Sequence, residues 1–290
     1  MRDVLLPGSL EELWRCFDEK PMALVFAGGT DLLVKMYNGS LDCEALICLE
    51  RISQLQGVSE HGDSIRIGAC TTHSRLLREP LIGKFLPALW KAIARIGSPP
   101  VRNMGTIGGN IRTASPAGDT LPPLYAMKAE VELLSREGTR RMDLSEFIHG
   151  PGATALESAE IVSAVWVKKP EEFDLQHFEK VGLRSALACS VASFAALLKL
   201  TPEKTVKKVS LAWGSVAPTV FRCPAAEEAL AGKTLCLESL REAAGIVRKA
   251  VSPISDVRAD AEYRREVAGN LMFRLVDIVD AEKGRKTDGY

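Results

Sequence analysis

The sequence predicts an α+β protein of two domains. The chain has 290 residues, which is more than one hydrophobic core usually organises. Short apolar strand candidates and helix-like segments are interleaved over its first part. A polar, proline-containing break at 170–174 is followed by two strand-like runs and then by helices. This order predicts a first α+β domain over residues 1–173 and a smaller α+β domain over residues 174–290.

The N-terminal segment predicts a helix followed by a strand that ends at two glycines. Ser9 can cap the helix, and Glu12 follows it at the spacing of a capping box. The apolar residues that share one face of this helix are Leu10, Leu13, Trp14 and Phe17. Residues 22–27 then form a buried strand candidate, and Gly28 and Gly29 follow it directly.

The remaining elements are predicted from periodicity and turn residues. Strands or strand-turn segments are expected over 45–49, 64–69, 133–142, 161–167, 185–200 and 206–216. Helices are expected over 72–77, 86–96, 121–127, 224–231, 237–250 and 263–279. Residues 97–118 are rich in turn formers and show no helix period, so we expect a long loop that binds a ligand.

Composition and charge exclude several classes of protein. Lysine plus arginine equals aspartate plus glutamate, at 37 each, which argues against a general binder of nucleic acid or anionic membranes. No apolar run reaches the roughly 18 residues of a membrane span. The first seven residues are too short and too broken for a signal peptide. The seven cysteines include no CxxC pair, which fits a reducing compartment, so we expect a cytoplasmic protein.

Common catalytic and metal-binding motifs are missing. The sequence contains no HExxH, no GxSxG and no EF-hand loop, and its four histidines lie far apart. Residues 150–155 match GxGxxA formally, but Pro151 lies inside the turn and no βαβ unit surrounds it. We therefore predict a plain loop there, no metal site and no catalytic side chain.

Two glycine pairs carry the chemistry that remains. Gly28 and Gly29 stand before Thr30 and Asp31, and Thr106-Ile107-Gly108-Gly109-Asn110 repeats the pattern of two glycines beside polar residues. Glycine admits positive φ and close approach of a ligand, and successive free amides can bind an anion. Each pair alone can be a tight turn and no more. Together they favour a ligand with a diphosphate.

An acid and a lysine complete the candidate set. Asp119 lies in a Ser-Pro-Ala-Gly-Asp loop, where a carboxylate can accept hydrogen bonds from ribose hydroxyls or can cap the helix that follows. Lys180 lies at the start of the second predicted domain. A lysine at such a position is either solvated or stabilises negative charge on a cofactor.

These segments resemble a known family. AGGTDLL, GSPPVRNMGTIGGNI and TASPAGD are similar to the FAD-binding subunit of the molybdenum hydroxylases, which include xanthine, nicotinate and carbon monoxide dehydrogenases. FEKVGLRSALACSVAS and GSVAPTVFRCPAAEEAL resemble the C-terminal domain of the same subunit. The resemblance covers nearly the whole chain. It implies a FAD-binding domain of two α+β subdomains, of the PCMH and vanillyl-alcohol-oxidase-like type, and a smaller flavoprotein C-terminal domain.

The resemblance also implies which residues contact FAD. The implied positions are Val25, Phe26, Ala27, Gly28, Gly29, Thr30, Asp31, Leu32, Ile96, Thr106, Ile107, Gly108, Gly109, Asn110, Ile111, Asp119, Val162 and Lys180. Asp119 matches an acid that contacts the ribose, and Ile96 matches a position beside the adenine. Ile96 departs from the family, where this position can be aromatic. The cysteine-bearing insertion of one branch is absent, so FAD is the one cofactor expected on this chain.

The resemblance implies an electron-transfer role. Partner subunits of the family carry molybdopterin and 2Fe–2S clusters, and FAD passes electrons to NAD⁺ or another acceptor. We expect a xanthine-dehydrogenase-like oxidoreductase subunit that has an iron–sulfur partner and a molybdopterin partner. The alternatives are the same subunit in a nicotinate, aldehyde or carbon monoxide dehydrogenase, a self-contained flavin oxidoreductase, or a non-catalytic assembly protein that has lost FAD.

Overall fold

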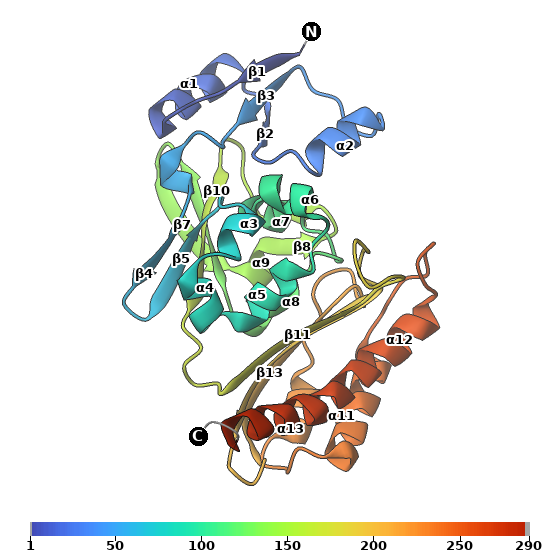
Figure 1. Ribbon diagram of the computed structural model, residues 1–290. Coiled ribbons are helices and arrows are strands. Elements are labelled where there is room, and N and C mark those ends of the chain that lie inside the picture. The colour runs from blue at the N-terminus through green and yellow to red at the C-terminus, as the bar shows by residue number, and fades with distance from the viewer. Residues whose placement is uncertain (1, 288–290) are drawn as a thin grey trace. The chain divides into compact units, whose positions relative to one another are not determined.

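The computed structural model describes residues 2–287, and the side chains of residues 2–280. The described residues form two compact units. Unit 1 consists of residues 2–84, Ile96–Ser115 and Lys128–Lys169, and unit 2 consists of Phe85–Arg95, Pro116–Met127 and residues 170–287. Both units combine helices with sheets, which confirms the predicted α+β class (Figure 1). The single boundary between residues 173 and 174 stays a prediction.

Unit 1 begins with a three-stranded parallel sheet (Figure 1). Its strands, in spatial order, are β1 (Asp3–Leu5), β3 (Ala45–Cys48) and β2 (Leu24–Phe26). Helix α1 (Leu10–Glu19) follows β1, and the Ser9 hydroxyl accepts the Glu12 amide at its start, as predicted. Leu13 of α1 is buried in one cluster with Ile47 of β3. Helix α2 (Leu32–Tyr37) follows β2 and has no buried residue.

The second sheet of unit 1 is antiparallel and five-stranded. Its strands, in spatial order, are β4 (Val58–His61), β5 (Ser64–Gly68), β10 (Ile161–Lys168), β6 (Glu130–Ser135) and β7 (Gly138–Asp143). The central strand β10 has a nearly continuous apolar sequence, IVSAVWVK, and is buried over most of its length. A strand that is buried on both faces needs such a sequence, because neither face meets water.

Short elements connect these sheets. They are η1 (Ser53–Leu55), α3 (His73–Leu76), α4 (Pro80–Phe85), α6 (Pro99–Met104), α7 (Ile107–Thr113), α9 (Leu144–Phe147), β8 (Ile148–Gly150) and β9 (Ala153–Thr154). Thr72 caps α3 by accepting the Arg75 amide, at the start of the helix predicted over 72–77. Residues 150–155 lie in and after the hairpin of β8 and β9, so no Rossmann turn occurs there.

Unit 2 is a three-stranded antiparallel sheet with helices on both faces. Its elements are α5 (Pro87–Ala94), α8 (Leu121–Ala126), β11 (Leu175–Val181), β12 (Ala192–Leu200), β13 (Val206–Gly214), α10 (Pro224–Leu230), α11 (Leu237–Ala250), α12 (Ala261–Asn270), η2 (Leu271–Phe273) and α13 (Arg274–Thr287). The central strand β12 is buried at seven consecutive positions. Its even-numbered residues pack toward α10–α13. Helix α8, which precedes the three strands in the sequence, also contacts β12 and β13.

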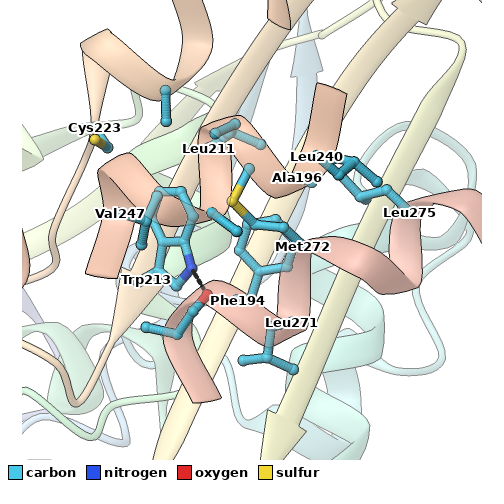
Figure 2. Close-up of a cluster of buried hydrophobic side chains, with 14 of the residues drawn as sticks. Phe194, Ala196, Leu211, Trp213, Cys223, Leu240, Val247, Leu271, Met272 and Leu275 are labelled. Carbon is cyan, nitrogen blue, oxygen red and sulfur yellow. Dashed lines mark hydrogen bonds between the residues drawn. The ribbon is translucent and has the colours of Figure 1, made fainter. Parts of the chain in front are cut away.

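The core of unit 2 lies between the sheet and its C-terminal helices. Figure 2 shows Phe194 and Trp213 from the strands packed among Val247, Leu271 and Met272. The Trp213 indole nitrogen donates to the Ala268 carbonyl oxygen at 3.0 Å, so its one polar atom is satisfied inside the core.

Two sequence-based expectations are wrong. Residues 97–118 are not one long loop, because α6 and α7 lie within them. Ser98 caps α6, and two prolines occupy its first turn, where a missing N–H costs nothing. The expected single helix over 263–279 is divided into α12 and α13, with the 3₁₀ turn η2 between them.

Candidate functional site

The first glycine turn connects β2 to α2 in unit 1. Gly29 has φ +68°, a conformation that favours glycine. The backbone amides of Gly28, Gly29, Thr30 and Asp31 donate to no other described residue. Thr30 and Asp31 are also exposed. Four successive unpaired amides beside a hydroxyl are the arrangement that binds an anion.

The second glycine pair lies inside α7, so it is the start of a short helix rather than an open turn. The Thr106 hydroxyl caps this helix and accepts the Gly109 amide at 3.1 Å. The amides of Ile107, Gly108 and Asn110 donate to Thr71, Ala69 and Thr106 carbonyl oxygens respectively. All four amides that the sequence offered here for phosphate therefore have partners within the protein.

Three of these glycines differ in what an added side chain would meet. A Cβ on Gly28 would lie 1.7 Å from the Met104 carbonyl oxygen, and one on Gly108 would lie 2.5 Å from the Ala69 Cβ. Both glycines are therefore needed for close packing of backbone segments. A Cβ on Gly109 would approach only the Thr106 hydroxyl, at 3.0 Å. Gly109 is thus the position whose missing side chain the surrounding protein does not explain, and it leaves room for a ligand.

The two glycine segments meet each other within unit 1. Gly28 packs against the backbone of Met104, and the Thr30 hydroxyl lies 3.3 Å from the Cβ position of Gly105. Asp31 accepts the Thr113 hydroxyl at 3.4 Å and pairs with Lys35 at 2.7 Å. The structure therefore brings together the two segments that the sequence placed about 80 residues apart.

A hollow of about 300 Å³ opens beside this junction. The residues that line it are Gly28, Glu50, Arg51, Gln56, Cys70, Thr72, Asn103, Met104 and Thr106. Only Gly28 and Thr106 among them were candidates from the sequence. The others follow β3, η1 and β5, cap α3 or lie in α6, and no local motif marks them.

A buried histidine supports the second segment. His73 is 3 % exposed, its backbone amide donates to the Gly105 carbonyl oxygen at 2.9 Å, and its Nδ1 has no partner among the described residues. Burial, with a smaller contribution from Arg102, lowers the pKa of His73 to about 4. The imidazole is therefore neutral at pH 7.

Two further candidates lie in unit 1, away from the turns in sequence. Val162 is a buried residue of β10. The carbonyl oxygen of the next residue, Ser163, accepts the amide of Ala69, and Ala69 packs against Gly108. Ile96 is half-buried, and its carbonyl oxygen accepts the Arg102 guanidinium at 2.8 Å. Nothing in the side-chain contacts of Ile96 marks an adenine site, so that assignment stays a prediction.

The last two candidates, Asp119 and Lys180, form an ion pair in unit 2. The Lys180 Nζ lies 2.5 Å from the Asp119 Oδ2, and their side chains are only 9 % and 7 % exposed. The buried Ser190 hydroxyl donates to the Asp119 Oδ1, also at 2.5 Å. Burial raises the pKa of Asp119, and Lys180 and Ser190 oppose that rise. Each carboxylate oxygen retains lone pairs, so a ribose contact of Asp119 stays a prediction.

A second hollow, of about 340 Å³, adjoins this ion pair in unit 2. Lys180 lines it together with Arg95 and Arg184, and the other lining residues are Val181, Gly182, Ser185, Ala186, Leu187 and Ala188. The Arg95 and Arg184 guanidinium groups donate to the carbonyl oxygens of Ser185 and Leu187. Neither pairs with a carboxylate in the described part of the chain, so the hollow carries net positive charge.

Other kinds of site are not found among the described residues. They contain no group of three or more His, Cys, Asp and Glu side chains placed to hold a metal ion. None of the helices within 2–287 is long and apolar enough to cross a membrane. All seven cysteines are free.

Comparison with protein families gives matches over both parts of the chain. Residues 1–169 match the family described as the FAD binding domain in molybdopterin dehydrogenase. Residues 177–279 match the CO dehydrogenase flavoprotein C-terminal domain.

Individual relatives match along almost their full length. The chain is 31 % identical to the nicotinate dehydrogenase FAD-subunit of Eubacterium barkeri, covering 96 % of each chain. It is 30 % identical to the putative xanthine dehydrogenase FAD-binding subunit of Escherichia coli, covering 92 % of each. Among solved structures, a chain of carbon monoxide dehydrogenase from Hydrogenophaga pseudoflava matches with a TM-score of 0.88 and 31 % identity, covering 94 % of this chain and 95 % of that one.

Proposed function

Because this chain belongs to the family of FAD-binding subunits of the molybdopterin-dependent dehydrogenases, we propose that its two glycine segments hold the diphosphate of FAD for electron transfer. The observation that carries the proposal is the set of four successive amides, from Gly28 to Asp31, that have no partner in the part of the chain that the structure describes. An anion bound there gains hydrogen bonds without breaking any within the protein.

The residues present fit this cofactor. The first turn supplies backbone N–H donors and the Thr30 hydroxyl, and Gly109 leaves space on the facing segment. The second segment contributes shape rather than donors, because its amides are already bonded. We propose the remaining contacts as the family implies them: Ile96 to the adenine, Asp119 to the ribose, and Val162 and Lys180 to the cofactor. These assignments rest on motif position.

FAD, when bound, accepts electrons and passes them on; the chain supplies binding, orientation and charge. Lys180 and the two arginines of the unit 2 hollow provide positive charge that favours an electron-rich or anionic group. No side chain of the chain is required as an acid or a base for this role.

We propose partner subunits that carry molybdopterin and 2Fe–2S clusters, since the described residues contain no metal-binding group of their own. The holoenzyme is proposed to be xanthine-dehydrogenase-like, with NAD⁺ as the acceptor. The relatives are named for nicotinate, xanthine and carbon monoxide, and these stay alternatives together with aldehydes. The free cysteines support a reducing compartment, and we propose the cytoplasm.

A self-contained flavin oxidoreductase is the competing function. It would need titratable groups converging on a substrate beside the flavin. The hollow in unit 1 includes the acid Glu50 and the cation Arg51, which is the one observation in its favour. Substrate-dependent reduction of the flavin by the chain without partner subunits would support this alternative over electron transfer.

The test of FAD binding is the visible spectrum of the purified 290-residue chain. We expect flavin absorption and release of FAD on denaturation. Gly109→Asp places bulk and negative charge on the open side of α7 and should abolish the colour without unfolding the chain. Gly83→Asp is the matched control, because Gly83 is also a helical glycine of unit 1 and is exposed, with nothing near its Cβ position. A colourless wild-type chain that takes up no added FAD would contradict the proposal.

A further inference from the structure

The carboxylate of Asp119 is bound by two side chains of unit 2 rather than left open. Asp119 is 6 % exposed, its Oδ2 accepts the Lys180 ammonium and its Oδ1 accepts the Ser190 hydroxyl. No other side chain or amide in the described residues donates to this carboxylate. Because burial disfavours the ionised form, each of the two donors matters for keeping the charge.

The Lys180 ammonium has a fixed position, but not all of its N–H donors have a partner among the described residues. An ammonium has three N–H donors. One goes to Asp119 and a second, at 3.3 Å, to the Arg95 carbonyl oxygen. The third remains for a ligand in the hollow that Lys180 lines. Within the described residues, the other two cations there, Arg95 and Arg184, bond to carbonyl oxygens and not to a carboxylate, whereas Lys180 pairs with Asp119.

Ser190 is held by its own surroundings. It is fully buried, and the next residue, Val191, pairs its amide with the Val181 carbonyl oxygen at 2.8 Å. The Val191 carbonyl oxygen accepts the buried Arg264 guanidinium at 2.5 Å. Arg264 is itself paired with Asp256 at 2.7 Å. The backbone of the residue after Ser190 is therefore held at both its N–H and its carbonyl oxygen, and the Ser190 hydroxyl can serve as a fixed donor.

The segment that carries Asp119 is attached to the same sheet. The Ser215 amide donates to the Pro116 carbonyl oxygen at 2.8 Å, and the Ser210 hydroxyl donates to the Ala126 carbonyl oxygen at 2.7 Å. These bonds lie at the two ends of the 116–127 segment. Asp119, Ser190 and Lys180 thus share one rigid support within unit 2.

We propose that Ser190 is a positioning residue of the flavin site: by holding the Asp119 carboxylate, it fixes the Lys180 ammonium so that its remaining N–H serves an anionic or electron-rich group of the cofactor. This inference rests on the proposed FAD-binding function. Ser190 itself does not touch the cofactor. Its effect passes through Asp119 to Lys180.

The test compares two buried serines. Ser190→Ala removes the donor to Asp119, whereas Ser193→Ala removes a buried hydroxyl, 1 % exposed, that has no partner among the described residues. Dissociation constants for FAD are measured by quenching of flavin fluorescence. We expect about a tenfold increase for Ser190→Ala, the size of one hydrogen bond to a charged group, and less than about a twofold change for Ser193→Ala.

Two further variants separate positioning from a general loss of structure. Ser190→Cys keeps the volume and a weak donor, so its dissociation constant should lie between wild type and Ser190→Ala. In a Lys180→Met background, the effect of Ser190→Ala should shrink to the part that passes through the proposed ribose contact of Asp119, because positioning of Lys180 no longer contributes. Thermal unfolding of each variant verifies that the fold is retained.

The possible outcomes distinguish the two proposals. Tight FAD binding by wild type with equal affinities for Ser190→Ala and Ser193→Ala would overturn the positioning role and leave FAD binding intact. An undiminished effect of Ser190→Ala in the Lys180→Met background would also overturn it. Failure of the wild-type chain to bind FAD would overturn both proposals.

Discussion

The two glycine segments of unit 1 have similar residues and opposite hydrogen-bond states. The first turn leaves the amides of 28–31 without partners among the described residues and exposes Thr30. In the second segment the amides of 107–110 are all bonded, and Thr106 is buried as a helix cap. Two segments of similar composition therefore have different roles. The first segment has donors to offer an anion, and the second provides the backbone against which the first is packed.

The comparison extends to the helices that follow each glycine pair. Helix α2, after the first turn, buries none of its residues. Helix α7 buries Ile107, Gly108 and Ile111 and thereby anchors its segment to the five-stranded sheet. Substitutions that act on stability should therefore fall on the second segment and its contacts, and substitutions that act on binding should fall on the first.

The largest expected effect comes from the contact between the segments. Gly28→Ala places a Cβ 1.7 Å from the Met104 carbonyl oxygen, and that backbone atom cannot rotate away. We expect the free energy of unfolding to fall by about 3 kcal/mol or more. Gly109→Ala, whose Cβ meets only the Thr106 hydroxyl, should change it by less than about 1 kcal/mol. Urea denaturation measures both, and equal losses would contradict the packing argument.

A pH effect on stability should come from His73, whose backbone amide bonds to Gly105 before the second segment. His73 has a pKa of about 4 in the folded chain against 6.5 in the unfolded chain, so the unfolded state takes up a proton first as the pH falls. The free energy of unfolding should therefore decrease between pH 6.5 and pH 4, by about 3 kcal/mol in total.

Replacement of the histidine tests this assignment. His73→Leu should flatten the dependence measured by urea denaturation at a series of pH values. His149→Gln, at an exposed position of the same unit, should leave the dependence unchanged. A slope that persists in His73→Leu would assign the acid sensitivity to other groups.

The two threonines should separate stability from binding. Thr106→Ala removes a helix cap and should lower the free energy of unfolding by about 1 kcal/mol. Thr30→Ala removes an exposed hydroxyl that bonds to none of the described residues, and it should change the free energy of unfolding by less than about 0.5 kcal/mol. Thr30→Ala should instead weaken FAD binding about tenfold. The reverse pattern in denaturation and fluorescence titrations would invert the roles given to the two segments.

The smallest expected effect is on self-association of the chain rather than on its free energy of unfolding. Helix α2 exposes Val34 at 55 % and Tyr37 at 91 %, which is unusual for apolar side chains on a helix. We expect the chain without partners to self-associate at high concentration. Val34→Lys with Tyr37→Lys should shift light scattering toward monomer, and Tyr263→Lys, at an exposed residue of unit 2, should not. A monomeric wild-type chain would contradict this.

The sequence predicted the regular elements whose signals are local, and it missed others such as β4 and β11. The capping residues Ser9 and Thr72, the hairpin of β6 and β7 and the apolar strand β10 each have a pattern that needs no distant partner. Helices α6 and α7 were missed because their glycines and prolines are rare in helices. Ser98 before two prolines and Thr106 before Ile107 are capping signals that were present for both.

The sequence predicted which residues form the candidate site, but it did not predict the hydrogen bonds among them. The motifs located both glycine segments, but no motif states that the amides of 107–110 find Ala69, Thr71 and Thr106. The same holds for Asp119, because its partners Lys180 and Ser190 lie more than 60 residues away. Such pairings depend on how distant strands are brought together, and a single sequence carries no local sign of them.

The division of unit 2 into separate pieces of chain has a consequence for synthesis. Segments 85–95 and 116–127 leave the ribosome long before β11–β13, the strands that cover them. All residues of α8, Leu121–Ala126, are buried only once those strands have formed. A nascent chain therefore carries two apolar helices without their sheet until translation is nearly complete, which is the interval in which a chaperone would be needed.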